Sequence, residues 1–230
     1  HCVDDAATLR RQVARWAGAL ATRLRPALAT VGTPESAATA LQLLAQRQLL
    51  CALRDGPYGA HALAQAIEQR LRIEFNVPIH AAWFAGRSVI IGENDYTHGL
   101  FNGDIGIALA DADGTLRVWF AATDEHGVAS MRALLPDLLP PHEGAGAITI
   151  HKAQGSEYTH IGVVLPPDAD SRVLSRQLLY TALSRARSSI ELWGDEAVIA
   201  AALQHAVRRV GGLAEALVAA VSQGSPSASD

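Results

Sequence analysis

The sequence predicts an α/β fold in which helices flank a parallel sheet and a smaller antiparallel module is inserted. Beyond residue 147, short β-branched runs alternate with helix patterns, which is typical of a parallel sheet. The first 75 residues read helix, helix, strand, helix, the opening of an α/β unit. Between these parts, short strand patterns follow one another with turn signals and no helix pattern, which indicates an antiparallel module.

Composition and charge support two modules. The chain has 230 residues, 49% of them apolar, and a formal net charge of −4. Residues 1–75 carry nine Arg against six acids, residues 76–146 three Arg against nine acids, and residues 147–193 five Lys or Arg against four acids. The acidic middle segment therefore looks like a separate insert, and global charge does not argue for nucleic-acid binding.

Several classes are excluded or disfavoured. No apolar run approaches the roughly 20 residues that a membrane span needs. The chain begins at His1 without a signal-peptide pattern, so we expect a fragment of a longer cytoplasmic protein. Cys2 and Cys51 have no framework spacing and are predicted to be free thiols. The nine histidines are scattered, and we predict no structural metal.

The first module opens with two helices. Apolar spacing predicts a helix over Asp4–Ala29, with acids at its start and Pro26 near its end. Thr33 is a cap candidate followed by Pro34 at the first helical position, and this helix should run to about Gln46. The next predicted elements are a buried strand at Gln48–Ala52, a turn at Arg54–Gly59 and a helix at Ala60–Leu71.

The acidic segment contains four strand candidates. They lie at Trp83, Val89–Ile91, Gly103–Leu109 and Leu116–Phe120, with a hairpin turn signal at Asp111–Gly114. From residue 147 we predict strands at 147–151, 160–165 and 189–193, and helices at 173–187 and 196–208. A short helix at Leu213–Val221 and a flexible tail at Gln223–Asp230 should follow.

The loop His151–Glu157 is the first candidate for chemistry. It should lie at the carboxyl end of a parallel strand, where ligands bind in open α/β sheets. It offers a cation, an amide, a glycine, a hydroxyl and a carboxylate, and Lys152 is the chain's single lysine. Such a set suits phosphate or sugar oxygens, although an ordinary polar loop explains it as well.

Arg185 and Arg187 end the predicted helix 173–187. Two positions apart on a helix they would point about 200° apart, so only one would face a given ligand. One interpretation is a positioned arginine that stabilises charge on a transferring phosphoryl group. The other is a pair of arginines that only complements the helix dipole. Spacing alone does not choose between these readings.

Two motifs carry a resemblance. HKAQGSE followed by LLYTALSRAR closely resembles motifs V and VI of superfamily 1 helicases, in the right order. LLCALRDGPYG, AWFAGRSVIIGENDYTHGLFNGDIGIAL and LWGDEAVIAAAL resemble the C-terminal part of the RecD family, which includes the α subunit of the RecBCD exodeoxyribonuclease V complex. The resemblance covers nearly all of residues 40–215.

The resemblance implies a function and an architecture. It implies the C-terminal motor domain of an ATP-dependent 5′→3′ DNA helicase that acts in double-strand-break repair and recombination with RecB-like and RecC-like subunits. The chain would be the second RecA-like domain, split into residues 1–77 and 146–222 by an SH3-like barrel at 78–145, with a tail at 223–230. ATP and Mg²⁺ would lie between it and an upstream RecA-like domain, and single-stranded DNA would cross it.

The resemblance also implies roles for single residues. Arg185 matches the arginine that reaches the γ-phosphate of ATP, and Arg187 lies outside that role. Further nucleotide contacts are expected from Gln154, Gly155, Glu157 and, in the motif IV region, Arg54. DNA-backbone contacts are expected from Thr149, His151 and Lys152.

The inserted segment carries two further expectations. Asn102-Gly103-Asp104 should form a turn of the barrel, which we favour over a catalytic role for Asp104. For Trp83, Tyr96 and Phe101 a place in the barrel core is favoured over stacking on DNA bases.

The departures from the family matter. No GxxxxGK[ST] loop and no Walker B acid occur, so the chain alone should neither bind Mg-ATP tightly nor hydrolyse it. Three alternatives stay open: the helicase part of a conjugative relaxase, a non-catalytic module that docks on a partner subunit or on DNA, and a degenerate ATPase with no motor role.

Overall fold

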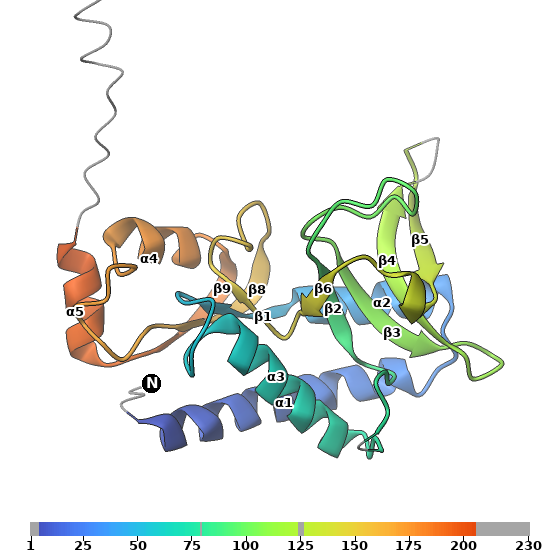
Figure 1. The fold of residues 1–230 in the computed structure, drawn as a ribbon, viewed down its shortest axis with the longest axis horizontal. Helices are drawn as coiled ribbons and strands as arrows, with labels where there is room; N and C mark the ends of the chain where they lie inside the picture. Colours follow the sequence, from blue (N-terminus) through green and yellow to red (C-terminus); the bar gives the residue numbers. More distant parts are fainter. Residues whose placement is uncertain (1–4, 79, 124–126, 206–230) are drawn as a thin grey trace, which may run out of the picture.

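The computed structural model describes residues 5–78, 80–123 and 127–205 (Figure 1). Its first sheet has four strands in the order β7-β1-β8-β9, and all neighbours run parallel. The strands are β1 (Arg47–Cys51), β7 (Ala147–Thr149), β8 (Tyr158–Val164) and β9 (Ala186–Trp193). The predicted parallel sheet is confirmed.

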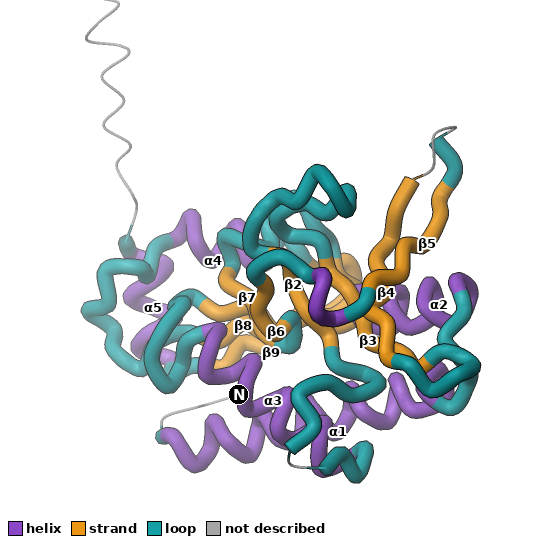
Figure 2. The backbone as a smooth tube through the Cα atoms, turned by 45° about the vertical axis from the view of Figure 1, so that its right-hand side comes forward, coloured by secondary structure: helices purple, strands orange, loops and turns teal. Residues whose placement is uncertain are grey.

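Helices cover both faces of this sheet. They are α1 (Ala6–Leu28), α2 (Pro34–Ala45), α3 (Ala60–Glu74), α4 (Arg176–Leu183) and α5 (Glu196–Gln204). Because side chains alternate along a strand, Leu49 and Cys51 pack with α1 and α3, whereas Leu50 packs with α4 and α5. The tube in Figure 2 shows the strands between these two groups of helices.

The first two helices begin where the sequence predicts. The Asp5 carboxylate accepts a hydrogen bond from the Thr8 backbone N–H at 2.7 Å, which caps α1. Thr33 and Ser36 form a reciprocal capping box at the start of α2, with Pro34 at the first helical position. Local capping chemistry therefore sets both starts.

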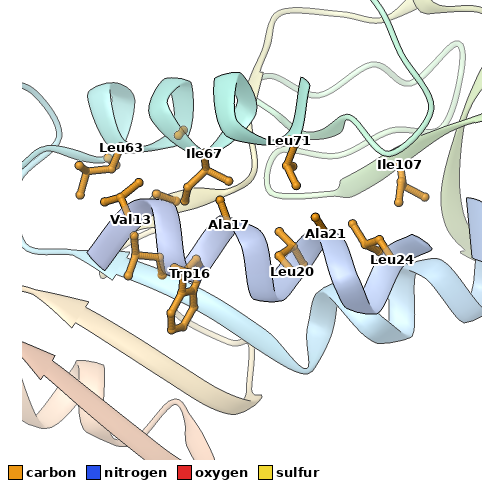
Figure 3. Packing of buried hydrophobic residues seen from close by; sticks show 14 of the residues in the cluster. Val13, Trp16, Ala17, Leu20, Ala21, Leu24, Leu63, Ile67, Leu71 and Ile107 are labelled. Atoms are coloured by element: carbon orange, nitrogen blue, oxygen red, sulfur yellow. The ribbon is translucent and has the colours of Figure 1, made fainter. Parts of the chain in front are cut away.

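Helix α1 joins the sheet to α3. Figure 3 shows Val13 and Ala17 facing Leu63 and Ile67 of α3, while Trp16 points the other way, toward the strands. The absence of a side chain at Gly162 on β8 gives Trp16 its room, because a Cβ there would lie 3.1 Å from the indole ring. The helix is thus an integral layer of the α/β unit.

The second sheet has five antiparallel strands. They are β2 (Ser88–Ile91), β3 (Ile105–Ala110), β4 (Leu116–Thr123), β5 (Ala129–Leu134) and β6 (His142–Gly144), with the short 3₁₀ helix η1 (Pro136–Leu138) before β6. The strand order is β5-β4-β3-β2-β6, and among the described residues β5 and β6 do not pair with each other. The antiparallel insert is therefore present, but closure into an SH3-like barrel is not confirmed.

Several predicted elements differ from the observed ones. Trp83 lies in a loop rather than a strand, because the chain turns at Gly86, which has a φ of +97°. Strands β5 and β6 were not predicted, since neither ASMRAL nor HEG has a strand pattern. The helix predicted at 173–187 ends at Leu183, and β9 begins three residues earlier than predicted.

Part of the predicted C-terminal region lies outside the described residues, namely the last residues of the helix expected at 196–208, the helix at Leu213–Val221 and the tail. Cys2 also lies outside them. In the described part of the chain, none of the helices combines the length and the apolar character that a membrane crossing requires.

Cys51 is a free thiol on the central strand β1 and is fully buried. Burial raises the pKa of this thiol well above its usual value, so it stays protonated at neutral pH. We expect Cys51 to resist iodoacetamide at pH 8 in the folded protein and to react after denaturation. Peptide mapping by mass spectrometry checks this, and rapid labelling of native Cys51 would contradict the buried placement.

Candidate phosphate-binding site

The loop from Ile150 to Glu157 crosses the parallel sheet from one end of its strands to the other. It leaves β7 after Thr149, which pairs with Cys51 at the carboxyl end of β1. It enters β8 at Tyr158, which pairs with Ala186 at the amino end of β9. The polar residues of this loop therefore do not form one site, and two clusters arise at opposite ends of the sheet.

The carboxyl-end cluster comprises Arg54, His61, Glu143, Thr149 and Lys152. The Glu143 carboxylate lies at its centre, 2.7 Å from Lys152 Nζ and 3.3 Å from Arg54 Nη2. The His61 imidazole lies between two carboxylates, with Nε2 3.2 Å from Glu143 and Nδ1 2.8 Å from Asp55. One carboxylate from the inserted sheet thus faces two cations from the α/β unit.

Strand geometry explains why these side chains meet. Arg54 follows β1 and Lys152 follows β7, and these adjacent parallel strands end at the same level. Thr149 Oγ1 accepts a hydrogen bond from the Lys152 backbone N–H at 3.2 Å, which fixes the start of the loop. The cluster borders a cleft of about 160 Å³. His151 is exposed beside it.

Glu143 is held in its charged form. Burial alone would raise its pKa, but the hydrogen bonds from Lys152 and His61 outweigh that effect and leave the pKa lower than usual. The carboxylate is therefore ionised at neutral pH. It neutralises one of the two positive charges that Arg54 and Lys152 bring to the cleft.

The amino-end cluster comprises Ser156, Glu157, Arg185 and Arg187. The Arg185 guanidinium donates from Nε to the Thr181 carbonyl at 3.2 Å and from Nη1 to the Ser156 carbonyl at 3.2 Å. Nη2 donates to Ser184 Oγ at 3.0 Å. Within the described part of the chain, these contacts use three of its five N–H groups, so two N–H groups remain for an anion.

Arg185 and Arg187 do not lie on opposite sides of a helix, so the predicted geometry is wrong at this point. Helix α4 ends at Leu183, and the Arg185 N–H donates a tighter turn-type hydrogen bond to the Ala182 carbonyl. The Arg185 carbonyl then accepts a hydrogen bond from the Tyr158 N–H, and this bond starts the pairing of β9 with β8. Arg187 Nε lies 2.9 Å from Glu157 Oε2, and both side chains are more than half exposed. Both arginines therefore contact the end of the same loop.

Gly155 turns the loop between the two clusters. Its φ is +88°, in the left-handed region that strains any residue with a side chain. Gln154 precedes it and is exposed, and no side-chain hydrogen bond in the described ranges joins Gln154 to either cluster. The two predicted nucleotide contacts thus lie on the turn itself, and their contact with ATP stays a prediction.

Arg54 and Arg185 were both predicted to contact ATP phosphate, but they lie in different clusters. Its predicted role is a second contact to ATP phosphate beside Arg185, and that role stays a prediction. Its observed contacts are with His61 and Glu143 at the carboxyl end. The structure therefore brings Arg54 together with Thr149 and Lys152, the residues predicted to face DNA.

The inserted sheet borders the amino-end cluster across a second cleft. This cleft, of about 400 Å³, is lined by Gly103, Asp104, Ser156 and Glu157 among others. Asp104 accepts a hydrogen bond from the Phe101 backbone N–H at 2.8 Å, as expected of a turn residue. The favoured core placement is wrong for Tyr96 and Phe101, which are 79% and 49% exposed on the loop before β3.

Two residues of the carboxyl-end cluster have no signal in the sequence. Glu143 follows a proline pair and looks like a loop acid, and His61 looks like an ordinary helix residue. The pairing of β6 with β2, together with the short segment that leads from β6 into β7, brings Glu143 to the ends of β1 and β7. Such a contact depends on the tertiary fold and leaves no local pattern.

Comparison with known proteins defines the family. The family model of the UvrD-like helicase C-terminal domain matches residues 144–190. This range includes Arg185 and the loop from Ile150 to Glu157, which contributes to both clusters. The "RecBCD enzyme subunit RecD" of Mycobacterium tuberculosis is 38% identical over 193 residues, covering 84% of this chain and 32% of that protein. The chain corresponds to the C-terminal part of RecD-like superfamily 1 helicases. It spans about a third of the length of that RecD relative.

Two further sequence relatives agree with the RecD-like assignment. RecD of Haemophilus influenzae is 35% identical over 172 residues, covering 74% of this chain and 25% of that protein. The "ATP-dependent RecD2 DNA helicase" of Deinococcus radiodurans is 35% identical over 170 residues, covering 70% and 22%. Among solved structures, a Bacteroides Pif1 helicase in complex with ADP-AlF3 and ssDNA is 25% identical, with a TM-score of 0.37 and coverage of 64% and 36%.

Proposed function

We propose that this RecD-like chain is the second motor domain of an ATP-dependent 5′→3′ DNA helicase subunit of a RecBCD-type complex, acting in double-strand-break repair and recombination. It supplies an arginine finger and DNA-backbone contacts, and RecB-like and RecC-like subunits are its partners. The observation that carries the proposal is the arrangement of Arg185, which is held by three acceptors and keeps two N–H groups for an anion.

The amino-end cluster fits one half of a nucleotide site. When bound, ATP supplies the phosphoryl group that is transferred to water, with Mg²⁺ on its phosphates. Arg185 would place a fixed positive charge beside that group, and Gln154, Gly155 and Glu157 would border it from the loop. The sequence has no GxxxxGK[ST] loop, so the phosphates of ATP and their Mg²⁺ would be held by an upstream domain. The chain alone is therefore expected to show no ATP turnover.

The carboxyl-end cluster fits contacts to a DNA backbone. Lys152 and Thr149 offer an ammonium and a hydroxyl beside an exposed His151, the groups that commonly bind phosphate without reading sequence. These contacts would hold the strand, while Arg185 would act at the other end of the sheet. The separation of the two clusters allows DNA affinity and turnover to be tested independently.

Lys152→Ala is expected to weaken binding of single-stranded DNA by the full-length protein about three- to tenfold, because one phosphate contact is lost. The slope of log affinity against log salt should become shallower by about 0.7. Fluorescence anisotropy with labelled oligothymidine from 50 to 200 mM NaCl measures both. Arg11→Ala, on the exposed side of α1, is the control and should change neither. An unchanged Lys152→Ala would remove the DNA contact from the proposal.

A further inference from the structure

The cations of the carboxyl-end cluster already hold an anion, and it belongs to the chain itself. Glu143 Oε2 faces Lys152 Nζ at 2.7 Å, and Glu143 Oε1 faces Arg54 Nη2 at 3.3 Å. One carboxylate therefore bridges two cations through its two oxygens. A phosphate group would contact the same two cations through two of its own oxygens.

We propose that Arg54 and Lys152 form one phosphate subsite, and that Glu143 occupies it until a phosphate displaces the carboxylate. The inference rests on the proposed function and extends it, since it joins Arg54 to Lys152 and gives the inserted sheet a part in ligand binding. Glu143 is a positioning residue and an internal competitor. It keeps two long cationic side chains aligned and lowers the affinity of the subsite.

The exposure of the three side chains makes displacement feasible. The side chains of Arg54, Glu143 and Lys152 are 64%, 33% and 31% exposed, so the cluster opens onto solvent. Ion pairs at such sites are weak because water screens them. The carboxylate can therefore leave the two cations without uncovering a buried charge, and a phosphate with more negative charge competes well.

The place of Glu143 in the fold links this exchange to the inserted sheet. Glu143 lies on β6, where it pairs with Ile90 of β2, and the chain continues through Gly144, Ala145 and Gly146 into β7. Lys152 follows that same strand. Displacement of the carboxylate would thus act on the short segment that connects the two sheets.

The phosphate has two chemical sources, and the test separates them. Glu143→Gln removes the charge while keeping the shape, and Glu143→Ala removes the side chain in case the amide still holds Lys152. Both are made in the full-length protein, with thermal melting to show that it folds. Binding is measured to labelled oligothymidine without nucleotide, and to a non-hydrolysable ATP analogue with Mg²⁺ without DNA.

If DNA is the source, Glu143→Gln should tighten oligothymidine binding roughly two- to thirtyfold, since two exposed ion pairs no longer compete. The slope of log affinity against log salt should steepen by at most about 0.7, because the variant carries one negative charge fewer beside the bound phosphate. The gain from Glu143→Gln should be smaller in a Lys152→Ala background, where the ion pair with Arg54 is the one that still competes. If the nucleotide is the source of the phosphate, Glu143→Gln should tighten binding of the ATP analogue instead. The subsite is then assigned to a nucleotide phosphate.

The matched control is Glu74→Gln. Glu74 also pairs with two arginines, Arg25 and Arg70, but it ends α3 thirteen residues after His61, about 20 Å away. It should leave both affinities unchanged. No gain with either ligand in both Glu143 variants overturns the inference, even where Lys152→Ala weakens DNA binding as proposed. A Lys152→Ala variant with unchanged DNA binding would remove the proposed DNA contact, and only a Lys152→Ala variant with both affinities unchanged would remove the subsite as well.

Discussion

Arg185→Ala in the full-length protein is expected to lower kcat for DNA-stimulated ATP hydrolysis by about 10³-fold or more, with little change in DNA affinity. A positioned arginine that stabilises phosphoryl-transfer charge is worth about 10³ to 10⁵ in rate. The Arg185 guanidinium is suited to this role because backbone carbonyls of Ser156 and Thr181 fix its direction. Steady-state ATPase assays at saturating DNA measure the effect.

Arg187→Ala is the matched control for this prediction. Arg187 lies two residues further along and forms an exposed ion pair with Glu157. Such pairs contribute at most about 1 kcal/mol, so kcat should fall by no more than about fivefold. Arg185→Lys should behave like Arg185→Ala, because an ammonium cannot keep three hydrogen bonds in the guanidinium plane and still offer two more. Near-normal turnover in Arg185→Ala would refute the arginine-finger role.

Trp16→Ala is expected to destabilise the folded chain by about 3 to 5 kcal/mol, the usual range for a large aromatic removed from a core. Trp16 is 2% exposed. Its ring stacks on His160 with centroids 5.5 Å apart and meets Trp193 edge-on at 5.6 Å. The Arg47 guanidinium lies 3.9 Å from the ring centroid. The substitution would leave a cavity between α1 and three strands.

Urea unfolding followed by circular dichroism measures this loss. Trp16→Phe keeps a ring against His160 and should cost less than half as much. Trp83→Ala is a second control, since Trp83 is half-buried on a loop of the insert and should also cost less. A loss below about 1 kcal/mol in Trp16→Ala would contradict the placement of α1 as a layer on the sheet.

The parallel sheet and the helix starts could be predicted because their signals are local. The run LLC on β1 and the β-branched run on β8 mark buried strands. Thr33-Pro34 carries its own capping chemistry. The antiparallel character of the insert followed from turn signals such as Asp111–Gly114, where the Asp111 side chain bonds the Asp113 and Thr115 N–H groups.

The elements that could not be predicted depend on tertiary partners. ARSSIELW has no strong strand pattern at its start, and it becomes β9 because β8 offers a parallel partner from Tyr158 onward. This pairing ends α4 at Leu183, so Arg185 and Arg187 do not have the helical geometry that was predicted to separate them. Local propensity is overridden by pairing in such segments.

The sequence was enough to predict which residues belong to the candidate site, but only part of how they are arranged in space. The loop His151–Glu157 and Arg185 were identified from their chemistry and resemblance. Their division between two ends of the sheet was not, because it depends on the loop crossing from β7 to β8. Glu143 was missed because β6 carries no strand pattern of its own, and its place beside Lys152 depends on the pairing of β6 with β2.

The most direct test of the two-ended arrangement compares Lys152→Ala and Arg185→Ala in one experiment, ATPase rate against oligothymidine concentration in the full-length protein. The separation of the clusters predicts that Lys152→Ala raises the DNA concentration for half-maximal rate and keeps kcat. It predicts that Arg185→Ala lowers kcat and keeps that concentration. If both variants change the same parameter, or if Arg185→Ala changes only the DNA dependence, the assignment of DNA and nucleotide to opposite ends of the sheet is wrong.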